Sequence, residues 1–304
     1  MPEGDDPVPD ALSTLAVVVE GARLAAGLVD ENGTIVVRDR IATPTRDAWA
    51  GLAGMIRRVL AAAPDGPPQP TSVATICSGP SDSRAGTVSP PGIYNWANYP
   101  VRERLEELTE LPVVVDSLAG AMAELRRRGP DGRRADPDGG SFLEVALGTS
   151  VDSACLVGGR RLRGAHGNAG SIAHVNVVPG GKPCWCDAEG CAEAYLATTA
   201  IEAEMNRPLQ RATPSIVERT GIMLGRALST VAVTVDVSLA HVSGPLVDTL
   251  GEPMLRAARS EIAVRSRLSN VVDLEIRPDG EVPLLVAAVV AARHAPDPAP
   301  VTSG

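Results

Sequence analysis

The amino-acid sequence predicts a two-lobed α/β protein, and three observations lead to that prediction. The chain has 304 residues, which is enough for two lobes that each bury a core. Its composition, with 44% hydrophobic and 21% charged residues, is typical of globular proteins. Strand-like and helix-like patterns occur in two similar runs, each of which opens with apolar strands and then alternates helices with strands. We therefore expect two related lobes around a cleft.

The first run begins with a predicted three-stranded antiparallel meander over residues 15–19, 24–29 and 34–38. The last two of these strands are joined by Asp-Glu-Asn-Gly at 30–33, which is a strong hairpin turn signal. Apolar residues with helical spacing then predict a helix over 46–60. The remaining predicted elements of this run are a strand at 72–77, a helix at 101–108, a strand at 112–116 and a helix at 118–127.

The second run begins with a predicted strand at 142–147, a turn at 148–152 and a return strand at 153–157. A Gly-rich loop at 164–170 and a predicted strand at 174–178 follow. The later predicted elements are a long helix at 213–234, a strand at 238–242, a helix at 246–262, a strand at 271–276 and a helix at 284–293.

We expect residues 14–117 together with 283–296 to form the N-terminal lobe and residues 118–282 to form the C-terminal lobe. Residues 1–13 and 297–304 are expected to be disordered tails.

Charge and hydropathy argue against several classes of function. The net charge of −9 and a pI near 5.0 argue against nucleic acid as the main partner. The only dense positive cluster, at 126–128 and 133–134, is interpreted as a solvated loop. The longest apolar run, at 283–292, is about half of a membrane span, so no membrane partner is expected. Because residues 1–13 are acidic and Pro-rich, unlike a signal peptide, we expect a cytoplasmic protein.

The cysteines point to a metal site. Three of the five lie within eight residues, and with a nearby histidine they give the spacing His-x9-Cys-x-Cys-x4-Cys. This clustering suggests metal binding in a reducing compartment rather than a disulfide framework. Three thiolates and one imidazole fill a tetrahedral zinc site and leave no open position, so the predicted zinc is structural. The predicted ligands are His174, Cys184, Cys186 and Cys191, and the alternative is a set of free thiols near a hydrogen-bonded histidine.

The same region carries a resemblance to a known family. Three short segments carry it: Gly-Ala-His-Gly-Asn-Ala-Gly-Ser-Ile-Ala-His at 164–174, Cys-Trp-Cys at 184–186 and Gly-Cys-Ala-Glu at 190–193. Together they resemble the ROK family of repressors, uncharacterised reading frames and sugar kinases, which includes bacterial glucokinases. Residues 24–33, 112–115 and 142–149 extend the resemblance over about 15–295. It implies the actin-like, ribonuclease-H-like kinase fold, with sugar and ATP meeting between the lobes. It also implies a homodimer or other homo-oligomer.

Both phosphate loops implied by the resemblance depart from the family pattern. The first, where kinases have Asp followed by Gly-Gly-Thr, has Val18 and then Glu20, Gly21 and Ala22. The second, Gly-Thr-Gly with further glycines in the family, begins with Gly148 and Thr149 but continues Ser-Val-Asp-Ser. Each loop has gained an acid, and one carboxylate facing a phosphate at about 4 Å costs about 4 kcal/mol at an effective dielectric of about 20. Binding of Mg·ATP is therefore doubtful.

The positions that correspond to the family's base and sugar ligands are also altered. The Asn-Asp pair that holds the general base is replaced by Ser117 and Leu118, and leucine cannot accept a proton. The alternative is that Asp116, two residues away, takes the role of the base. The sugar-binding Glu-x-Gly-His motif is Ser-Ile-Ala-His here, so His174 is its only matching residue, and Glu193 matches a second sugar ligand.

These departures lead to one main hypothesis and two alternatives. The main hypothesis is a ROK-type protein without kinase activity, which keeps a zinc-pinned scaffold and binds a small sugar or a protein partner. The first alternative is a divergent but active ATP-dependent hexose kinase. The second is the detached sensor half of a ROK transcriptional regulator, since about 14 residues precede the first predicted strand and are too few for a DNA-reading helix-turn-helix.

Overall fold

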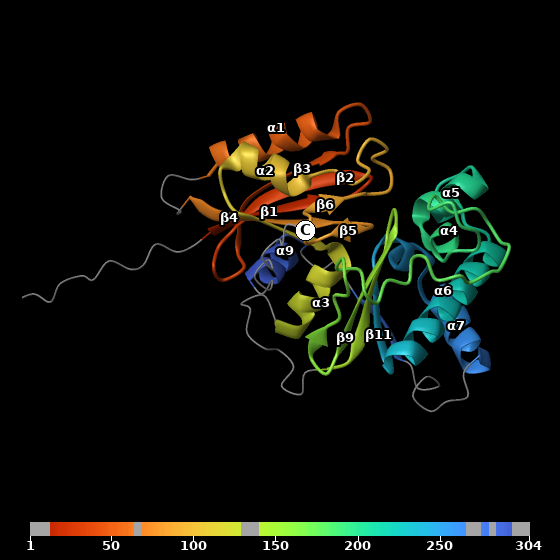
Figure 1. Ribbon diagram of the computed structural model, residues 1–304. Coiled ribbons are helices and arrows are strands. Elements are labelled where there is room, and N and C mark those ends of the chain that lie inside the picture. The colour runs from red at the N-terminus through yellow and green to blue at the C-terminus, as the bar shows by residue number, and fades with distance from the viewer. Residues whose placement is uncertain (1–12, 64–68, 129–139, 266–274, 280–283, 294–304) are drawn as a thin grey trace, which may run out of the picture.

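Two five-stranded sheets and the helices around them make up the structure (Figure 1). This computed structural model describes residues 13–63, 69–128, 140–265, 275–279 and 284–293. The prediction of a mixed α/β protein is confirmed. None of the helices within these ranges is long and apolar enough to span a bilayer. The expected tails lie outside the described residues, except for Ser13, which begins the first strand.

The first sheet has the strand order β3-β2-β1-β4-β7. Its antiparallel part is the predicted meander, which consists of β1 (Ser13–Val19), β2 (Arg23–Val29) and β3 (Ile35–Ala42). In the turn between β2 and β3, the Asp30 carboxylate accepts hydrogen bonds from the amides of Asn32 and Thr34 at 2.9 and 2.7 Å. The strands β4 (Pro70–Cys77) and β7 (Val113–Ser117) continue the sheet in parallel, and β1 is buried along its whole length because it lies inside the sheet.

Helices cover both faces of this sheet. On one face, α1 (Ala48–Ala61) packs on β2 and β3, and α2 (Val101–Thr109) packs on β7. The start of α1 is capped by Asp47, whose carboxylate accepts from the amide of Ala50 at 2.8 Å. On the other face lie α3 (Leu118–Arg128) and α9 (Leu284–Arg293), which pack against each other. A small hairpin of β5 (Ser81–Asp82) and β6 (Thr87–Val88) lies between β4 and α2 in the chain.

The second sheet has the order β10-β9-β8-β11-β12. Its strands are β8 (Phe142–Leu147), β9 (Val151–Val157), β10 (Arg160–Arg161), β11 (Leu239–Ser243) and β12 (Glu275–Asp279). The long helices α6 (Pro214–Val235) and α7 (Pro245–Arg265) pack closely together, since a Cβ on Gly221 would lie 2.2 Å from the carbonyl oxygen of Met254. The shorter helices of this half are α4 (Glu193–Leu196), α5 (Thr198–Met205) and the 3-10 turn η1 (Leu209–Arg211).

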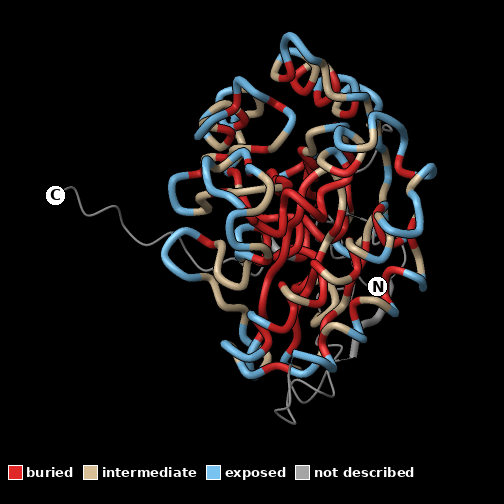
Figure 2. Tube along the Cα trace, turned by 90° about the vertical axis from the view of Figure 1, so that its right-hand side faces the viewer, coloured by how far each residue is buried: buried red, intermediate tan, exposed pale blue. Residues whose placement is uncertain are grey.

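Helix α3 lies between the two sheets and contributes to the core of each (Figure 1). Leu118 and Met122 pack with α9 and the first sheet, whereas Ala119 and Ala123 pack with Phe142 and the second sheet. Figure 2 shows the buried chain concentrated along the middle of the molecule, with exposed residues at its rim. The N-terminal end of α3 therefore lies where the two halves meet, which is where the candidate site is built.

Several sequence-based predictions were wrong in detail. Residues 174–178 do not form a strand: the amides of Val177 and Val178 both bond to the carbonyl of Gly190, so the segment pairs with the cysteine loop instead of a sheet. The arginines at 126–128 are not a solvated loop, because they form the last turn of α3 and Arg126 binds the fully buried Glu144 at 2.7 Å. Helices α4 and α5 were not predicted. The predicted strand at 271–276 lies mostly outside the described residues.

Candidate functional site

The four predicted metal ligands come together at one point of the second half. The ligand atoms of His174, Cys184, Cys186 and Cys191 all lie within 4.8 Å of one another. Cys184 Sγ is 3.8 Å from His174 Nδ1, and Cys186 Sγ is 3.7 Å from Cys191 Sγ. A tetrahedral ion with bonds of about 2.3 Å to sulfur separates its sulfur ligands by about 3.8 Å, so the spacing fits a four-coordinate metal.

The backbone of the cysteine loop accounts for this arrangement. The amide of Cys184 bonds to the carbonyl of Ala188 at 2.8 Å, which folds the chain back between the first two cysteines and the third. Gly190 has a φ of 77°, and a Cβ there would lie 1.8 Å from the carbonyl oxygen of Val178. The hydroxyl of Tyr195 accepts from the amide of Lys182 at 2.9 Å and ties the loop to α4. The loop therefore holds its thiols together through its own hydrogen bonds.

The pKa values of the four ligands indicate which kind of metal ion suits the cluster. Burial raises the pKa of Cys184 to about 12 and also raises the pKa of Cys191. Burial opposes the shift at Cys186, but the amide of Ala188 and the neighbouring thiols of Cys184 and Cys191 form hydrogen bonds that together lower its pKa. Burial lowers the pKa of His174, which favours the neutral imidazole that binds metals. A soft divalent cation would supply the positive charge that three neighbouring thiolates require.

An open cavity of about 420 Å³ lies directly beside this cluster. Its volume is in the range of small-molecule sites. His174 belongs to both, since its ring lines the cavity and its Nδ1 faces Cys184. Trp185, half exposed, meets the ring of His174 edge-on, with 5.1 Å between the ring centroids. The cavity walls also include Ser150 and two acids, Asp152 and Glu193.

Glu193, the second predicted sugar ligand, is at the start of α4 and points into this cavity. Its side chain is buried, and Oε2 accepts from the amide of Val151 at 2.7 Å. Burial raises its pKa to about 7, against a lowering effect of the Val151 amide and a further rise from the charge of Asp152. The structure thus brings His174 and Glu193 to one cavity, as the resemblance implied.

The residues of the first expected phosphate loop contact other parts of the chain. Glu20 forms an ion pair with Arg23 at 2.5 Å. Gly21 lies against the loop around Pro91, so closely that a Cβ at Gly21 would be 2.0 Å from the Pro91 carbonyl oxygen. Val18 is fully buried in the sheet and offers no metal ligand. These residues do not fit a Mg·ATP site.

The second loop uses its backbone for internal hydrogen bonds. The amide of Gly148 donates to the carbonyl of Ser150 at 3.0 Å, and the carbonyl of Gly148 accepts from the amide of Thr198 at 2.8 Å. The carbonyl of Thr149 accepts from the hydroxyl of Thr199 at 2.8 Å. A phosphate cradle needs free backbone N–H groups, and the Gly148 amide is already bonded within the loop. This loop also does not fit the nucleotide.

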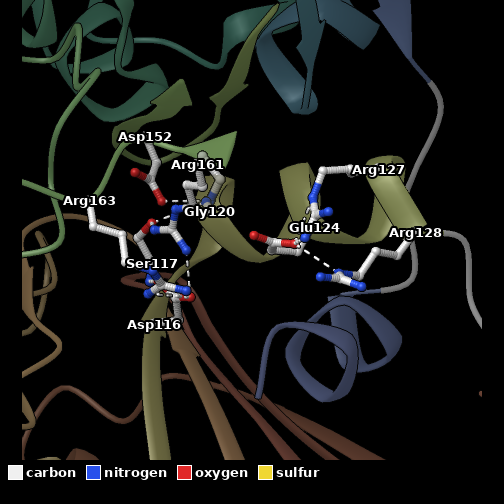
Figure 3. A network of polar contacts seen from close by, with 10 residues as sticks. Asp116, Ser117, Gly120, Glu124, Arg127, Arg128, Asp152, Arg161 and Arg163 are labelled. Carbon is white, nitrogen blue, oxygen red and sulfur yellow. Dashed lines mark hydrogen bonds and ion pairs between the residues drawn. The ribbon is translucent and has the colours of Figure 1, made fainter. Parts of the chain in front are cut away.

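The position of the family's base is filled by a core residue. Leu118 is 5% exposed and packs in the apolar cluster formed with α9. Asp116, the alternative base, is buried and forms an ion pair with Arg161 at 2.5 Å (Figure 3). Arg163 approaches the same carboxylate oxygen at 3.8 Å. With its charge engaged by two guanidinium groups, Asp116 is poorly placed to take a proton from a ligand.

Two residues near this position were missed as site residues. Asp152 lines the cavity, and its Oδ2 accepts from the amide of Ala119 at 2.9 Å, next to the base position that Leu118 fills. Burial raises the pKa of Asp152 to about 7, although the Ala119 amide and the charge of Arg161 act in the opposite direction. Arg161 fills the space beside Gly120, where a Cβ would lie 2.0 Å from its Cζ. A glycine inside a predicted helix was the sequence signal for this close approach.

Comparison with known proteins identifies relatives over most of the chain. The sequence profile of the ROK family matches residues 14–277. A glucokinase of Streptomyces coelicolor is 29% identical over 217 residues, which cover 69% of this chain and 63% of the relative. An N-acetylmannosamine kinase of Escherichia fergusonii is 26% identical over 251 residues, 77% of this chain and 83% of the relative. The chain thus spans slightly less than two thirds of the glucokinase.

Solved structures share the fold. A ROK family glucokinase from Streptomyces griseus, in complex with glucose and AMPPNP, has a TM-score of 0.70 at 24% identity, covering 92% of this chain and 99% of that one. A ROK family transcriptional regulator, a homologue of the Escherichia coli MLC protein, has a TM-score of 0.74 at 19% identity, covering 93% of this chain and 78% of that one. The expected two-lobed, actin-like fold of the sugar kinases is therefore confirmed.

Proposed function

The chain belongs to the ROK family, and from that premise we propose that it is a zinc-binding member without kinase activity that binds a small sugar in the cavity beside its metal cluster. The observation that carries the proposal is the state of the base position. Leu118 lies in an apolar cluster, and the neighbouring Asp116 is paired with Arg161 at 2.5 Å. A sugar hydroxyl has no acceptor at the position from which the family's kinases remove its proton.

The metal part of the proposal rests on the donor set. His174 and the three clustered cysteines supply one nitrogen and three sulfur atoms at tetrahedral spacing, which is the chemistry of a structural zinc site. Four protein ligands leave no open position, so the ion does no chemistry on a ligand. Its role is to fix the wall of the cavity that carries His174 and Trp185.

The sugar part rests on the cavity. Its volume, the polar residues in its lining and the presence of both His174 and Glu193 support a small hydroxylated ligand. The solved relative from Streptomyces griseus was obtained with glucose, and the curated relatives are kinases of glucose and of N-acetylmannosamine. A hexose or hexose derivative is the ligand class that these relatives suggest for this chain.

The absence of kinase activity is supported by three independent parts of the site. Phosphoryl transfer needs a metal ligand, free backbone amides around the phosphates and a base for the acceptor. Here the corresponding positions hold the buried Val18, a Gly148 amide bonded to Ser150, and Leu118. Loss of the base alone typically lowers the rate by a factor of about 10² to 10⁴. The loss of all three leaves no route to the reaction through these groups.

The second candidate function is a divergent sugar kinase, which is favoured by the 29% identity to a glucokinase. A coupled assay for ATP-dependent phosphorylation, run with a panel of hexoses on zinc-loaded protein, separates the two. We expect no turnover above the rate without protein, together with a ligand-induced rise in melting temperature for at least one sugar. Turnover that depends on both ATP and one sugar would instead assign the kinase function.

A further inference from the structure

The cavity beside the metal cluster has an unusual balance of hydrogen-bonding groups. Among the described residues that line it there is no lysine or arginine, whereas two carboxylates, Asp152 and Glu193, face it. Asn168, also in the lining, is engaged by the backbone of Ser81 through both its amide nitrogen and its oxygen. The two carboxylates have no basic partner in this described lining, so they favour a ligand that offers them hydrogen-bond donors.

Both acids are anchored at one short segment of chain and line the same cavity. Glu193 Oε2 accepts from the amide of Val151, and Asp152 is the next residue along β9. Asp152 Oδ2 accepts from the amide of Ala119 at the start of α3. Glu193 also accepts from Trp185, and Asp152 also accepts from the amide of Ser153. Since the two oxygens of a carboxylate offer about four acceptor sites, each acid retains capacity for a ligand. Burial is nearly complete for both, so their hydrogen bonds to a ligand would be little weakened by water.

One hydroxyl in the wall of the cavity has no hydrogen-bond partner among the described residues. Ser150, on the loop between β8 and β9, is 4% exposed, and its Oγ has no hydrogen-bond partner in the described part of the chain. A buried hydroxyl without a partner is costly unless a ligand or water satisfies it. Ser150 lines the cavity together with the two acids. The Ser150 hydroxyl lies behind the accessible surface of this wall, so the groups left for a cationic donor are the two carboxylates.

We propose that the cavity selects a sugar with a free primary amine, bound as the ammonium ion between Asp152 and Glu193. This inference rests on the proposed sugar-binding function and names the class of sugar. An ammonium group provides three donors and one positive charge, which matches two carboxylates without a basic partner in the lining. The same carboxylates disfavour sugar phosphates and sugar acids, because they would face a like charge in a buried cavity.

The burial of Asp152 supports the same conclusion. Burial raises its pKa to about 7, so an ammonium ion in the cavity would stabilise the charged form that the protein alone disfavours. The positive groups nearest to it do not replace such a ligand. Arg161 bonds to Asp116 and Ser117, and Arg163 also approaches Asp116. Neither arginine lines the cavity.

Calorimetric titration of the zinc-loaded full chain with matched sugars tests the proposal. The probes are glucosamine, mannosamine and galactosamine, each compared with its parent hexose and its N-acetyl derivative at physiological ionic strength. We expect at least one free amine to bind tenfold or more tightly than both of its neutral counterparts. In Asp152→Asn, which keeps an acceptor oxygen for the Ala119 amide, this advantage should fall below about threefold. The control Glu106→Gln removes an exposed charge on α2 and should leave the advantage unchanged.

The outcomes separate this inference from the proposed function. Binding of a neutral hexose as tight as that of its amine would overturn the amine assignment and leave sugar binding intact. An amine advantage that persists in Asp152→Asn, or that is lost equally in Glu106→Gln, would show nonspecific attraction and would also overturn it. If no sugar in the panel produces heat or a shift in melting temperature, both the inference and the sugar-binding proposal fail.

Discussion

Replacing Asp152 by asparagine should stabilise the protein at neutral and alkaline pH. The substitution is nearly isosteric and keeps an oxygen for the Ala119 amide, 2.9 Å away in the structure. It removes a carboxylate that is buried between β9 and the start of α3. Because burial disfavours the charged form, the native protein carries an ionisation penalty that the variant lacks.

The magnitude follows from the two pKa values of Asp152. Burial raises its pKa from an ordinary 3.8 to about 7 in the folded chain. An acid with a raised folded pKa costs nothing below the unfolded pKa, and its penalty grows as the pH rises toward the folded pKa. At 1.36 kcal/mol per pKa unit, the penalty reaches about 4 kcal/mol above pH 7. Between pH 5 and pH 8 the advantage of the variant should grow by about 2–3 kcal/mol.

Urea denaturation at closely spaced pH values measures this difference. Both proteins carry the same metal cluster, so pH effects on the cluster cancel when their free energies of unfolding are subtracted. Glu106→Gln, at an exposed position on α2, is the matched control and should show no pH-dependent advantage. A variant that is less stable than the native protein throughout this range, or whose advantage does not change with pH, would refute the reasoning. A carboxylate kept at such a cost is typical of functional sites.

Two further predictions concern other parts of the site. Cys184→Ser should lose the bound zinc and several kcal/mol of stability, because the free energy of metal binding is folding free energy in a closed site. Elemental analysis and thermal melts check this prediction, and full zinc occupancy with an unchanged melting temperature would contradict it. Gly120→Ala should destabilise the native chain by about 1–3 kcal/mol, because its Cβ would overlap the guanidinium of Arg161, which is buried and held by its ion pair with Asp116. In an Arg161→Ala background, Gly120→Ala should be neutral or stabilising by up to about 1 kcal/mol, since alanine favours helices more than glycine. A double-mutant cycle measures this difference, and equal effects in both backgrounds would count against an overlap with Arg161.

Much of the fold could be predicted from local patterns. The meander was recognisable because β1 is apolar along its length and the Asp-Glu-Asn-Gly turn has its own hydrogen bonds at Asp30. Helix α6 was recognisable because Thr213 caps it, Pro214 begins it and its apolar residues recur at helical spacing. By contrast, α4 and α5 have four and eight residues, which is too short for a clear helical period.

The false strand at 174–178 shows the limit of such patterns. Val-Asn-Val-Val at 175–178 has strand-like composition, but its partners are the carbonyl of Gly190 and its neighbours in the cysteine loop. This pairing depends on how the cysteine loop folds, and the composition of residues 175–178 does not predict it. The same spacing of cysteines, however, predicted four side chains that the structure does bring within 4.8 Å.

The rest of the site depended on contacts between distant segments. Arg161 reaches Asp116 across 45 positions, and Asp152 reaches the amide of Ala119 across 33. Neither contact has a local period or motif. Sequence reasoning located the altered loops and the leucine at the base position, but it did not show that Arg161 engages the only nearby acid on β7 or that Asp152 enters the cavity.

The central claim is that this chain has lost the nucleotide chemistry of its family, and calorimetric titration of Mg·ATP into folded, zinc-loaded protein tests it most directly. The titration should be run with and without a saturating sugar. The account predicts no binding heat up to millimolar ATP in either condition, because the Gly148 amide is bonded within its loop and Pro91 covers Gly21. Binding at micromolar ATP, strengthened by the sugar, would contradict the account and restore the kinase assignment.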